Sequence, residues 1–239
     1  MTRHSAASGA RLIAATVTCA MFARAALAAG SAEFAIRWDP AEGGPQTLEE
    51  IASALSLSPG KKSSFVVRYF SVAQPSDAPP DSLVIVRERT SGRAIESMYK
   101  LRGSSPFPSR GAEAGWQCPL ETTSKQKREV DIGWTGRNSN RRNHSLSCVA
   151  DGRVVDLLPP RFQPRPLDCT SSVTRIRAAG NLKVEHWSLP AGRIAFEVSR
   201  NGKDSAASVE AFAHQVVRPL MNRGVKPQTE SKTALGSSC

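Results

Sequence analysis

Aromatic residues are scarce in this sequence, and several common motifs are missing. Phe, Trp and Tyr make up 6% of its 239 residues, so a ladder of base-stacking rings, and with it specific nucleic-acid binding, is not expected. The chain has no C-x-x-C pair and no H-E-x-x-H, which leaves a zinc or redox site with little support. It has no G-x-S-x-G, which disfavours a hydrolase triad. No segment approaches 18 consecutive apolar residues, so no transmembrane helix is expected in the mature chain.

What the sequence has in excess is basic charge. It holds 32 Lys and Arg against 21 Asp and Glu, a formal net charge of +11. With 40% hydrophobic and 22% charged residues, the composition is that of a globular protein. The length suits one large domain or two small ones. The positive charge is therefore the first feature to explain.

Part of that charge belongs to a predicted export signal. Residues 1–29 contain early arginines, an apolar run from Leu12 to Phe22 and then Ala26-Leu27-Ala28, the small-x-small pattern of a cleavage site. We expect a signal peptide cut near Ala28 or Ala29, and a periplasmic or secreted protein whose residues 30–239 form one domain. Without residues 1–28 the chain keeps 29 basic and 21 acidic residues, a net charge of +8.

Export changes how the cysteines are interpreted. The mature chain keeps Cys118, Cys148, Cys169 and Cys239, an even number that predicts two disulfides in an oxidising compartment. Four cysteines allow three connectivities, and the sequence does not choose among them. We favour Cys118 paired with Cys148 or Cys169, and Cys239 fixing the C-terminal tail.

Short alternating strands predominate over long helices. Alternation of apolar and polar residues and intervening turn residues predict antiparallel strands, over 33–38, 64–71, 83–89, 94–101, 127–134, 172–177, 182–187 and 193–199. Helical spacing predicts helices over 48–57 and 205–221. Residues 103–124 are expected to form a loop. The basic stretch from Arg137 to His144 is interpreted as a solvated loop, with nucleic-acid or membrane binding as the lesser alternative.

Basic and acidic residues alternate with apolar ones on almost every predicted strand. On a single strand this needs no functional explanation, because one face of an antiparallel sheet is often solvated. Its recurrence points to a closed barrel, whose inward residues would form a cationic lumen with some carboxylates. Such a lumen would suit a polyanion held with a divalent cation.

A set of charged motifs also occurs in a fixed order along residues 33–236. They are Glu33-Phe34-Ala35-Ile36-Arg37, Arg68-Tyr69-Phe70-Ser71, Val86-Arg87-Glu88-Arg89, Tyr99-Lys100-Leu101-Arg102-Gly103, Arg128-Glu129-Val130-Asp131, Arg175-Ile176-Arg177, Ala195-Phe196-Glu197 and Ser231-Lys232. In this order they resemble the CYTH superfamily, the triphosphate tunnel metalloenzymes, whose members open with a strand of the form E-x-E-x-K.

The resemblance implies an α+β chain built on an antiparallel eight-stranded β-barrel, a tunnel, with a few flanking helices. It implies a polyanionic ligand, triphosphate or polyphosphate, and Mg²⁺ or Mn²⁺ that activates water for phosphoanhydride hydrolysis. On this basis the expected phosphate-binding residues are Arg37, Arg87, Arg89, Lys100, Arg128, Arg175, Arg177 and Lys232. The expected metal ligands are Glu33, Glu129, Asp131, Glu185 and Glu197.

Two departures from the family pattern concern the metal. Ala35 replaces the second glutamate of the opening motif, and Ala195 stands where the late Glu-x-Glu pair would have its first carboxylate. If Glu197 is instead the first of that pair, Ser199 takes the second place, and a carboxylate is still lost. Two functions therefore remain: an exported metal-dependent triphosphatase, or a non-catalytic anion-binding or structural protein that keeps the tunnel without a complete metal site.

Overall fold

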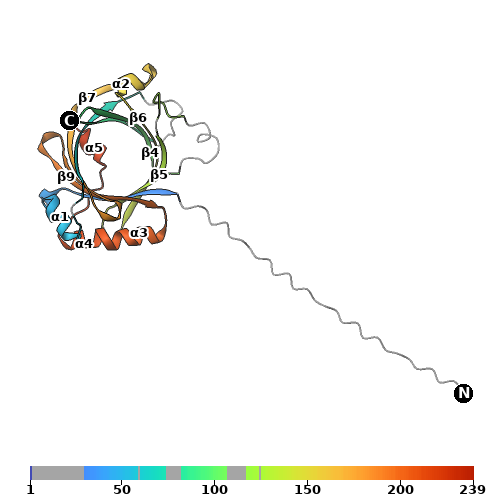
Figure 1. Cartoon of the computed structure of the whole chain (residues 1–239), viewed down its shortest axis with the longest axis vertical. Helices are drawn as coiled ribbons and strands as arrows, with labels where there is room; N and C mark the ends of the chain where they lie inside the picture. Colours follow the sequence, from blue (N-terminus) through green and yellow to red (C-terminus); the bar gives the residue numbers. More distant parts are fainter. Residues whose placement is uncertain (2–29, 59, 74–81, 107–116, 124) are drawn as a thin grey trace.

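A closed β-barrel forms the centre of the protein (Figure 1). The computed structural model describes residues 1, 30–58, 60–73, 82–106, 117–123 and 125–239. The predicted signal peptide thus lies almost entirely outside the described residues. The strands are β1 Ser31–Trp38, β2 Lys62–Ser71, β3 Leu83–Ser91, β4 Ala94–Gly103, β5 Lys125–Trp134, β6 Asn140–Asp151, β7 Arg165–Arg177, β8 Leu182–Ser188 and β9 Ile194–Lys203. They close in the order β1-β5-β6-β4-β3-β2-β7-β8-β9.

The prediction of eight antiparallel strands was wrong in number and in direction. The barrel has nine strands. β1 pairs in parallel with β5, with Glu33 opposite Asp131, whereas every other neighbouring pair is antiparallel. The parallel pair joins the first strand to the middle of the chain, so the barrel is mixed.

The ninth strand is β6, whose first half was interpreted as a solvated loop. From Asn140 onward its backbone pairs with β5 on one side, and from His144 onward with β4 on the other. Its apolar residues Leu146, Cys148 and Ala150 face outward into a buried cluster, while Ser145 and Ser147 take the opposite face. The exposed polar residues at the start of the strand hide its alternation in the sequence and predict a loop. Backbone pairing with strands on both sides nevertheless stabilises the extended conformation.

Helices cover the outside of the barrel. They are α1 Leu48–Ala54, α2 Val154–Leu157, α3 Ala206–Phe212, the π-helical turn η5 Ala213–Val217, α4 Arg218–Asn222 and α5 Lys232–Gly236, with 3-10 turns η1 Pro40–Glu42, η2 Pro160–Phe162, η3 Ala179–Asn181 and η4 Pro190–Gly192. The segment from α3 to α4 and helix α1 pack on the outer face of β1, β8 and β9 through Phe34, Trp38 and Phe212. Among the described residues, no helix is long and apolar enough to cross a bilayer.

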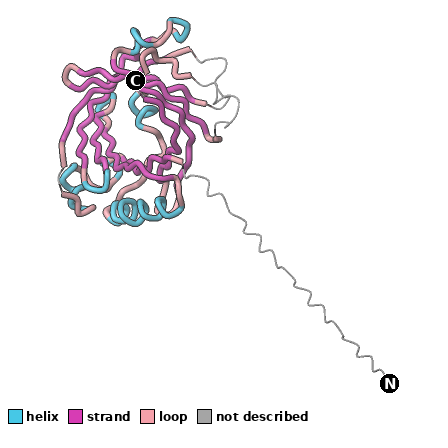
Figure 2. The backbone as a smooth tube through the Cα atoms, turned by 45° about the vertical axis from the view of Figure 1, so that its right-hand side comes forward, coloured by secondary structure: helices cyan, strands magenta, loops and turns pink. Residues whose placement is uncertain are grey.

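Helix α5 is the exception, because it lies within the ring of strands (Figure 2). Its Leu235 belongs to a buried cluster with the inward residues Phe65, Val67 and Trp187. Gly236 approaches Tyr69 so closely that a Cβ at this position would lie 2.0 Å from the phenol oxygen. The helix thus occupies part of the lumen and brings its own side chains into it.

Two disulfides secure the fold, Cys118–Cys148 and Cys169–Cys239. The first is one of the two pairings favoured from the sequence, and the second fixes the C-terminal tail as expected. Cys169 lies on β7 and Cys239 follows α5, so the inserted helix is covalently attached to the barrel wall.

Candidate functional site

The lumen is lined by charged side chains. Alternate residues of a barrel strand face inward, and hydrogen bonds that pass over an intervening strand identify the inward set. Lys183 on β8 reaches Glu33 on β1 across β9, at 3.0 Å. Arg102 on β4 reaches Asp131 on β5 across β6, at 2.7 Å. The inward basic residues include Arg37, Arg87, Arg89, Lys100, Arg102, Lys127, Arg141, Arg175, Arg177, Lys183 and, from α5, Lys232, and they outnumber the inward carboxylates, which include Glu33, Glu96, Glu129, Asp131, Glu185 and Glu197.

A row of five alternating charges crosses the centre of the lumen. Arg37 Nε donates to Glu197 Oε2 at 2.5 Å, and Lys232 Nζ donates to Glu197 Oε1 at 2.6 Å and to Glu185 Oε2 at 2.8 Å. Glu185 Oε1 accepts from Arg175 at 2.6 Å. Both glutamates are 1% exposed, and carboxylates buried this deeply require paired cations to stay ionised. The row begins and ends with an arginine, so it carries a net positive charge.

The surrounding cations keep the buried Glu185 and the half-buried Glu33 ionised. Burial alone would raise the pKa of Glu185, but Lys232, Arg175 and the Trp187 indole N–H together hold that pKa well below its ordinary value. Burial likewise opposes ionisation of Glu33, and the charges of Lys183, Lys232 and Lys100 reverse the effect, so its pKa is also well below the usual range.

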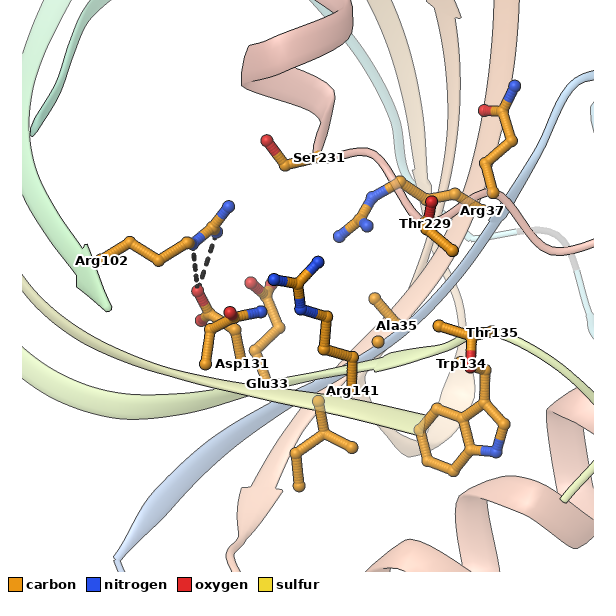
Figure 3. Close-up of a pocket in the computed structure, with 14 residues that line it drawn as sticks. Glu33, Ala35, Arg37, Arg102, Asp131, Trp134, Thr135, Arg141, Thr229 and Ser231 are labelled. Atoms are coloured by element: carbon orange, nitrogen blue, oxygen red, sulfur yellow. Dashed lines mark hydrogen bonds and ion pairs between the residues drawn. The ribbon is translucent and has the colours of Figure 1, made fainter. Parts of the chain in front are cut away.

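A pocket opens beside this row. Asp131 accepts from Lys100 at 2.9 Å and from Arg102 at 2.7 Å. Burial lowers the pKa of Lys100, although Asp131 opposes the shift. Figure 3 shows Arg37, Arg102 and Arg141 extending from different strands toward one space above Glu33 and Asp131. The cavity volume there is about 50 Å³, so the side chains fill most of this part of the lumen.

Three arginines meet at another part of the barrel wall. The guanidinium carbons of Arg89 and Arg175 lie 4.4 and 4.7 Å from the centroid of the Phe65 ring. Burial, together with the like charges of Arg87 and Arg175, lowers the pKa of Arg89 to about 10. Arg89 Nε is buried and has no hydrogen-bond partner among the described residues. Like charges held together with an unused donor form a natural position for an anion.

Most of the expected phosphate-binding residues face the lumen. Arg37, Arg87, Arg89, Lys100 and Arg175 do so from strands, and Lys232 does so from α5. Arg177 lies on the inward face of β7, exposed at the end of the strand. Arg128 lies on the opposite face of β5 from Glu129 and Asp131 and is exposed, so it is not part of this group.

Several lumen residues were not predicted as site residues. Arg102 follows Lys100 at the two-residue spacing that keeps a side chain on the same strand face, and this signal could have identified it. Lys183 and Lys127 carry the same signal on their strands. Arg141 was missed because it is the second residue of β6, in the part of that strand for which the sequence predicts a loop.

The five expected metal ligands lie in the lumen but do not gather as a metal site. Glu33 is paired with Lys183, Glu129 with Lys127 at 2.5 Å, and Asp131 with Lys100 and Arg102. Glu185 and Glu197 share Lys232. Ala35 lines the pocket between Glu33 and Arg37, where a further carboxylate would have added a ligand. No group of three metal-binding side chains occurs within the described part of the chain. As arranged, these carboxylates do not fit Mg²⁺ or Mn²⁺, which need several free oxygen ligands.

These features define a class: a closed barrel whose polar lumen carries more basic than acidic side chains. The barrel and the ordered motifs are consistent with the CYTH superfamily that the sequence resembles.

The chain matches no protein-family model and no curated protein. Similar solved structures include a candidate adenylate cyclase from Bacillus halodurans, with 14% identity, a TM-score of 0.48 and coverage of 85% of this chain and 96% of that one. A candidate adenylyl cyclase from Hippeastrum, described with a dominant triphosphatase activity, has 12% identity and a TM-score of 0.45, covering 84% and 92%. A conserved hypothetical protein from Pyrococcus furiosus has 11% identity and a TM-score of 0.46, covering 85% and 99%.

Proposed function

We propose that this protein binds triphosphate- or polyphosphate-type anions in its barrel lumen. The observation that carries the proposal is the arginine group Arg87, Arg89 and Arg175. Among these three, Arg175 has a buried carboxylate partner, Glu185, and Arg89 pairs with Glu96, which is 45% exposed. An anion placed among them would relieve the mutual repulsion and use the free Nε of Arg89.

An extended anion fits the distribution of charge better than a single small one. Basic side chains continue from the arginine group through Lys232 to Arg37 and on to the pocket with Arg102. Adjacent phosphates of a chain repel one another, and a series of cations along the lumen would neutralise that repulsion. The resemblance to triphosphate tunnel proteins supports the same class of ligand.

Export forms part of the proposal. Residues 1–29 have the pattern of a signal peptide, and both disulfides of the fold suit an oxidising compartment. We therefore propose that the protein works in the periplasm or outside the cell. Inorganic polyphosphate or another surface polyanion is then a more suitable ligand than a nucleotide.

Hydrolysis with a divalent metal is the other function that the resemblance implies. The ion pairs of all five candidate carboxylates argue against it, because a metal would first have to displace their lysine and arginine partners. We therefore propose anion binding without hydrolysis.

Calorimetric titration of the purified protein with tripolyphosphate at low salt tests the proposal. We expect binding whose affinity falls as salt rises, because the contacts are ionic. Arg89→Gln should weaken binding by about tenfold or more, whereas Arg128→Gln, on the outer face, should leave it unchanged. Absence of binding at low salt, or equal losses in both variants, would refute a lumen site.

Phosphate release in Mg²⁺ or Mn²⁺ tests the alternative. Release that is lost in Glu197→Gln and Lys100→Ala would establish the enzyme and overturn binding without hydrolysis. Equal release by the wild type and these variants would indicate contamination.

A further inference from the structure

Lys232 occupies the space between the two most deeply buried carboxylates of the lumen. Its ammonium lies 2.8 Å from Glu185 Oε2 and 2.6 Å from Glu197 Oε1, and its side chain is 17% exposed. We propose that Lys232 is a built-in cation, which takes the place that a divalent metal would need between Glu185 and Glu197. If Lys232 fills this place, an anion binds in the lumen without a metal. This consequence rests on the proposed function.

All four oxygens of the two carboxylates are engaged. Glu185 Oε1 accepts from Arg175, and Oε2 accepts from both Lys232 and the indole of Trp187 at 2.9 Å. Glu197 Oε1 accepts from Lys232, and Oε2 accepts from Arg37. A divalent ion that entered here would displace the ammonium and lie close to two guanidinium groups. Repulsion between the divalent ion and the two guanidinium groups would oppose metal binding, because charges interact strongly at a site so deeply buried.

The position of Lys232 is built into the fold. Its helix, α5, is capped by Ser231, whose Oγ accepts from the N–H of Ala234 at 3.1 Å. Leu235 is buried in the lumen cluster, and its carbonyl accepts from Arg193 Nη2 at 2.7 Å. The disulfide from Cys239 to Cys169 attaches the segment to β7. These contacts fix the backbone of the helix, so the pairing of Lys232 with the glutamates costs the rotamer freedom of its own side chain and little backbone entropy.

Replacement of a metal by a lysine also changes the charge presented to a ligand. A divalent ion would neutralise both carboxylates, Glu185 and Glu197. One ammonium neutralises only half of their charge, and Arg37 and Arg175 offset the rest. Arg37 and Arg175 are part of the barrel wall. The row of charges therefore keeps a positive arginine at each end at neutral pH without any exchangeable ion.

Titration with Mn²⁺, followed by the electron paramagnetic resonance signal of the free ion, tests the proposal without any anion. We expect no stoichiometric binding to the wild-type protein at pH 7. Lys232→Ala should bind about one Mn²⁺ per chain, at least about tenfold more tightly than the wild type. Lys226→Ala removes an exposed lysine of the same C-terminal segment and should behave as the wild type. The double variant Lys232→Ala with Glu185→Gln should lose the gained site.

Stoichiometric Mn²⁺ binding by the wild type that Glu185→Gln abolishes would overturn the proposal. So would Lys232→Ala protein that is folded by circular dichroism and binds no Mn²⁺. If that variant does not fold, Lys232→Met keeps the aliphatic stem and serves in its place, and the wild-type titration is decisive in either case.

A second experiment, titration with tripolyphosphate in EDTA and in Mg²⁺, distinguishes the role of Lys232 from the proposed function. Tripolyphosphate affinity should be no weaker in EDTA than in Mg²⁺, and a requirement for Mg²⁺ would contradict metal-free binding. If tripolyphosphate binds under neither condition, the proposed function fails, while the Mn²⁺ titration still decides the role of Lys232.

Discussion

The guanidinium carbon of Arg89 lies 4.4 Å from the centroid of the Phe65 ring, on a barrel wall that also carries Arg87 and Arg175. The aromatic face contributes a favourable cation–π contact. It does not remove the electrostatic cost, because burial and two like charges still lower the pKa of Arg89 to about 10. The fold therefore maintains an unfavourable charge that a bound anion would offset.

Replacement of Arg89 should stabilise the ligand-free protein. A basic group whose pKa is lower in the folded than in the unfolded state disfavours folding at every pH below the folded pKa. We expect Arg89→Met to raise the free energy of unfolding at pH 7 by about 1 kcal/mol, after subtraction of the lost contacts with Phe65 and Glu96. Urea unfolding without phosphate measures this change. A clear loss of stability would show that the arginine group is a structural element rather than a ligand site.

Acid should weaken the buried pairing of Glu185 with Lys232. Because its folded-state pKa lies below the ordinary 4.5, Glu185 contributes stability that is complete above pH 4.5 and is lost as the pH falls toward the folded value. Glu185→Gln should cost about 3 kcal/mol at pH 7, since it leaves Lys232 and Arg175 with one carboxylate fewer. Melting temperatures of both proteins from pH 7 to pH 3 should converge in acid. A constant difference across that range would contradict the assignment.

The disulfide that holds α5 should contribute strongly to stability. Cys169–Cys239 closes a segment with a sequence separation of 70 residues, for which the chain-entropy model gives about 4 kcal/mol. We expect the double variant Cys169→Ser and Cys239→Ser to be less stable by up to that amount in denaturant unfolding. Limited proteolysis should then cut the released C-terminal segment first. Unchanged resistance of residues 225–239 would mean that packing alone holds the helix.

A single methyl group should disturb the insertion of α5. In Gly236→Ala the new Cβ would lie 2.0 Å from Tyr69 Oη and 2.4 Å from its Cζ, so the helix or the buried ring has to move. Overpacking of this kind costs about 1–3 kcal/mol. The melting temperature should fall, and Gly30→Ala, where nothing lies within 4 Å of the added Cβ, is the matched control. Equal melting temperatures for both variants would refute the close packing.

Alternation in the sequence was sufficient to locate the barrel strands other than β6, although β7 begins at Arg165, seven residues before the predicted start at 172. β1 and β9, for example, carry apolar residues on the outer face and charges on the inner one, so each displays its period of two. β6 begins with exposed polar residues and has serines on its lumen face, so its pattern is visible only once β4 and β5 pair with it. The parallel pairing of β1 with β5 is a long-range choice that no local pattern encodes.

The charged site was predicted in kind but not in its connections. Motif order and strand parity indicated Arg37, Arg89 and Glu197 as lumen residues. That Lys232 pairs with both Glu185 and Glu197 depends on where α5 enters the barrel, which a five-residue helix after a long loop does not reveal. The residue types thus suggested that the carboxylates are metal ligands. Only the folded structure reveals that they form ion pairs with lysines and arginines instead.

A crystal structure of the protein grown at low salt with tripolyphosphate tests the central claim most directly. We predict phosphate density inside the barrel, in contact with Arg87, Arg89 and Arg175, with the Nε of Arg89 donating to a phosphate oxygen. Density confined to the outer surface, or an empty lumen at saturating tripolyphosphate, would contradict it.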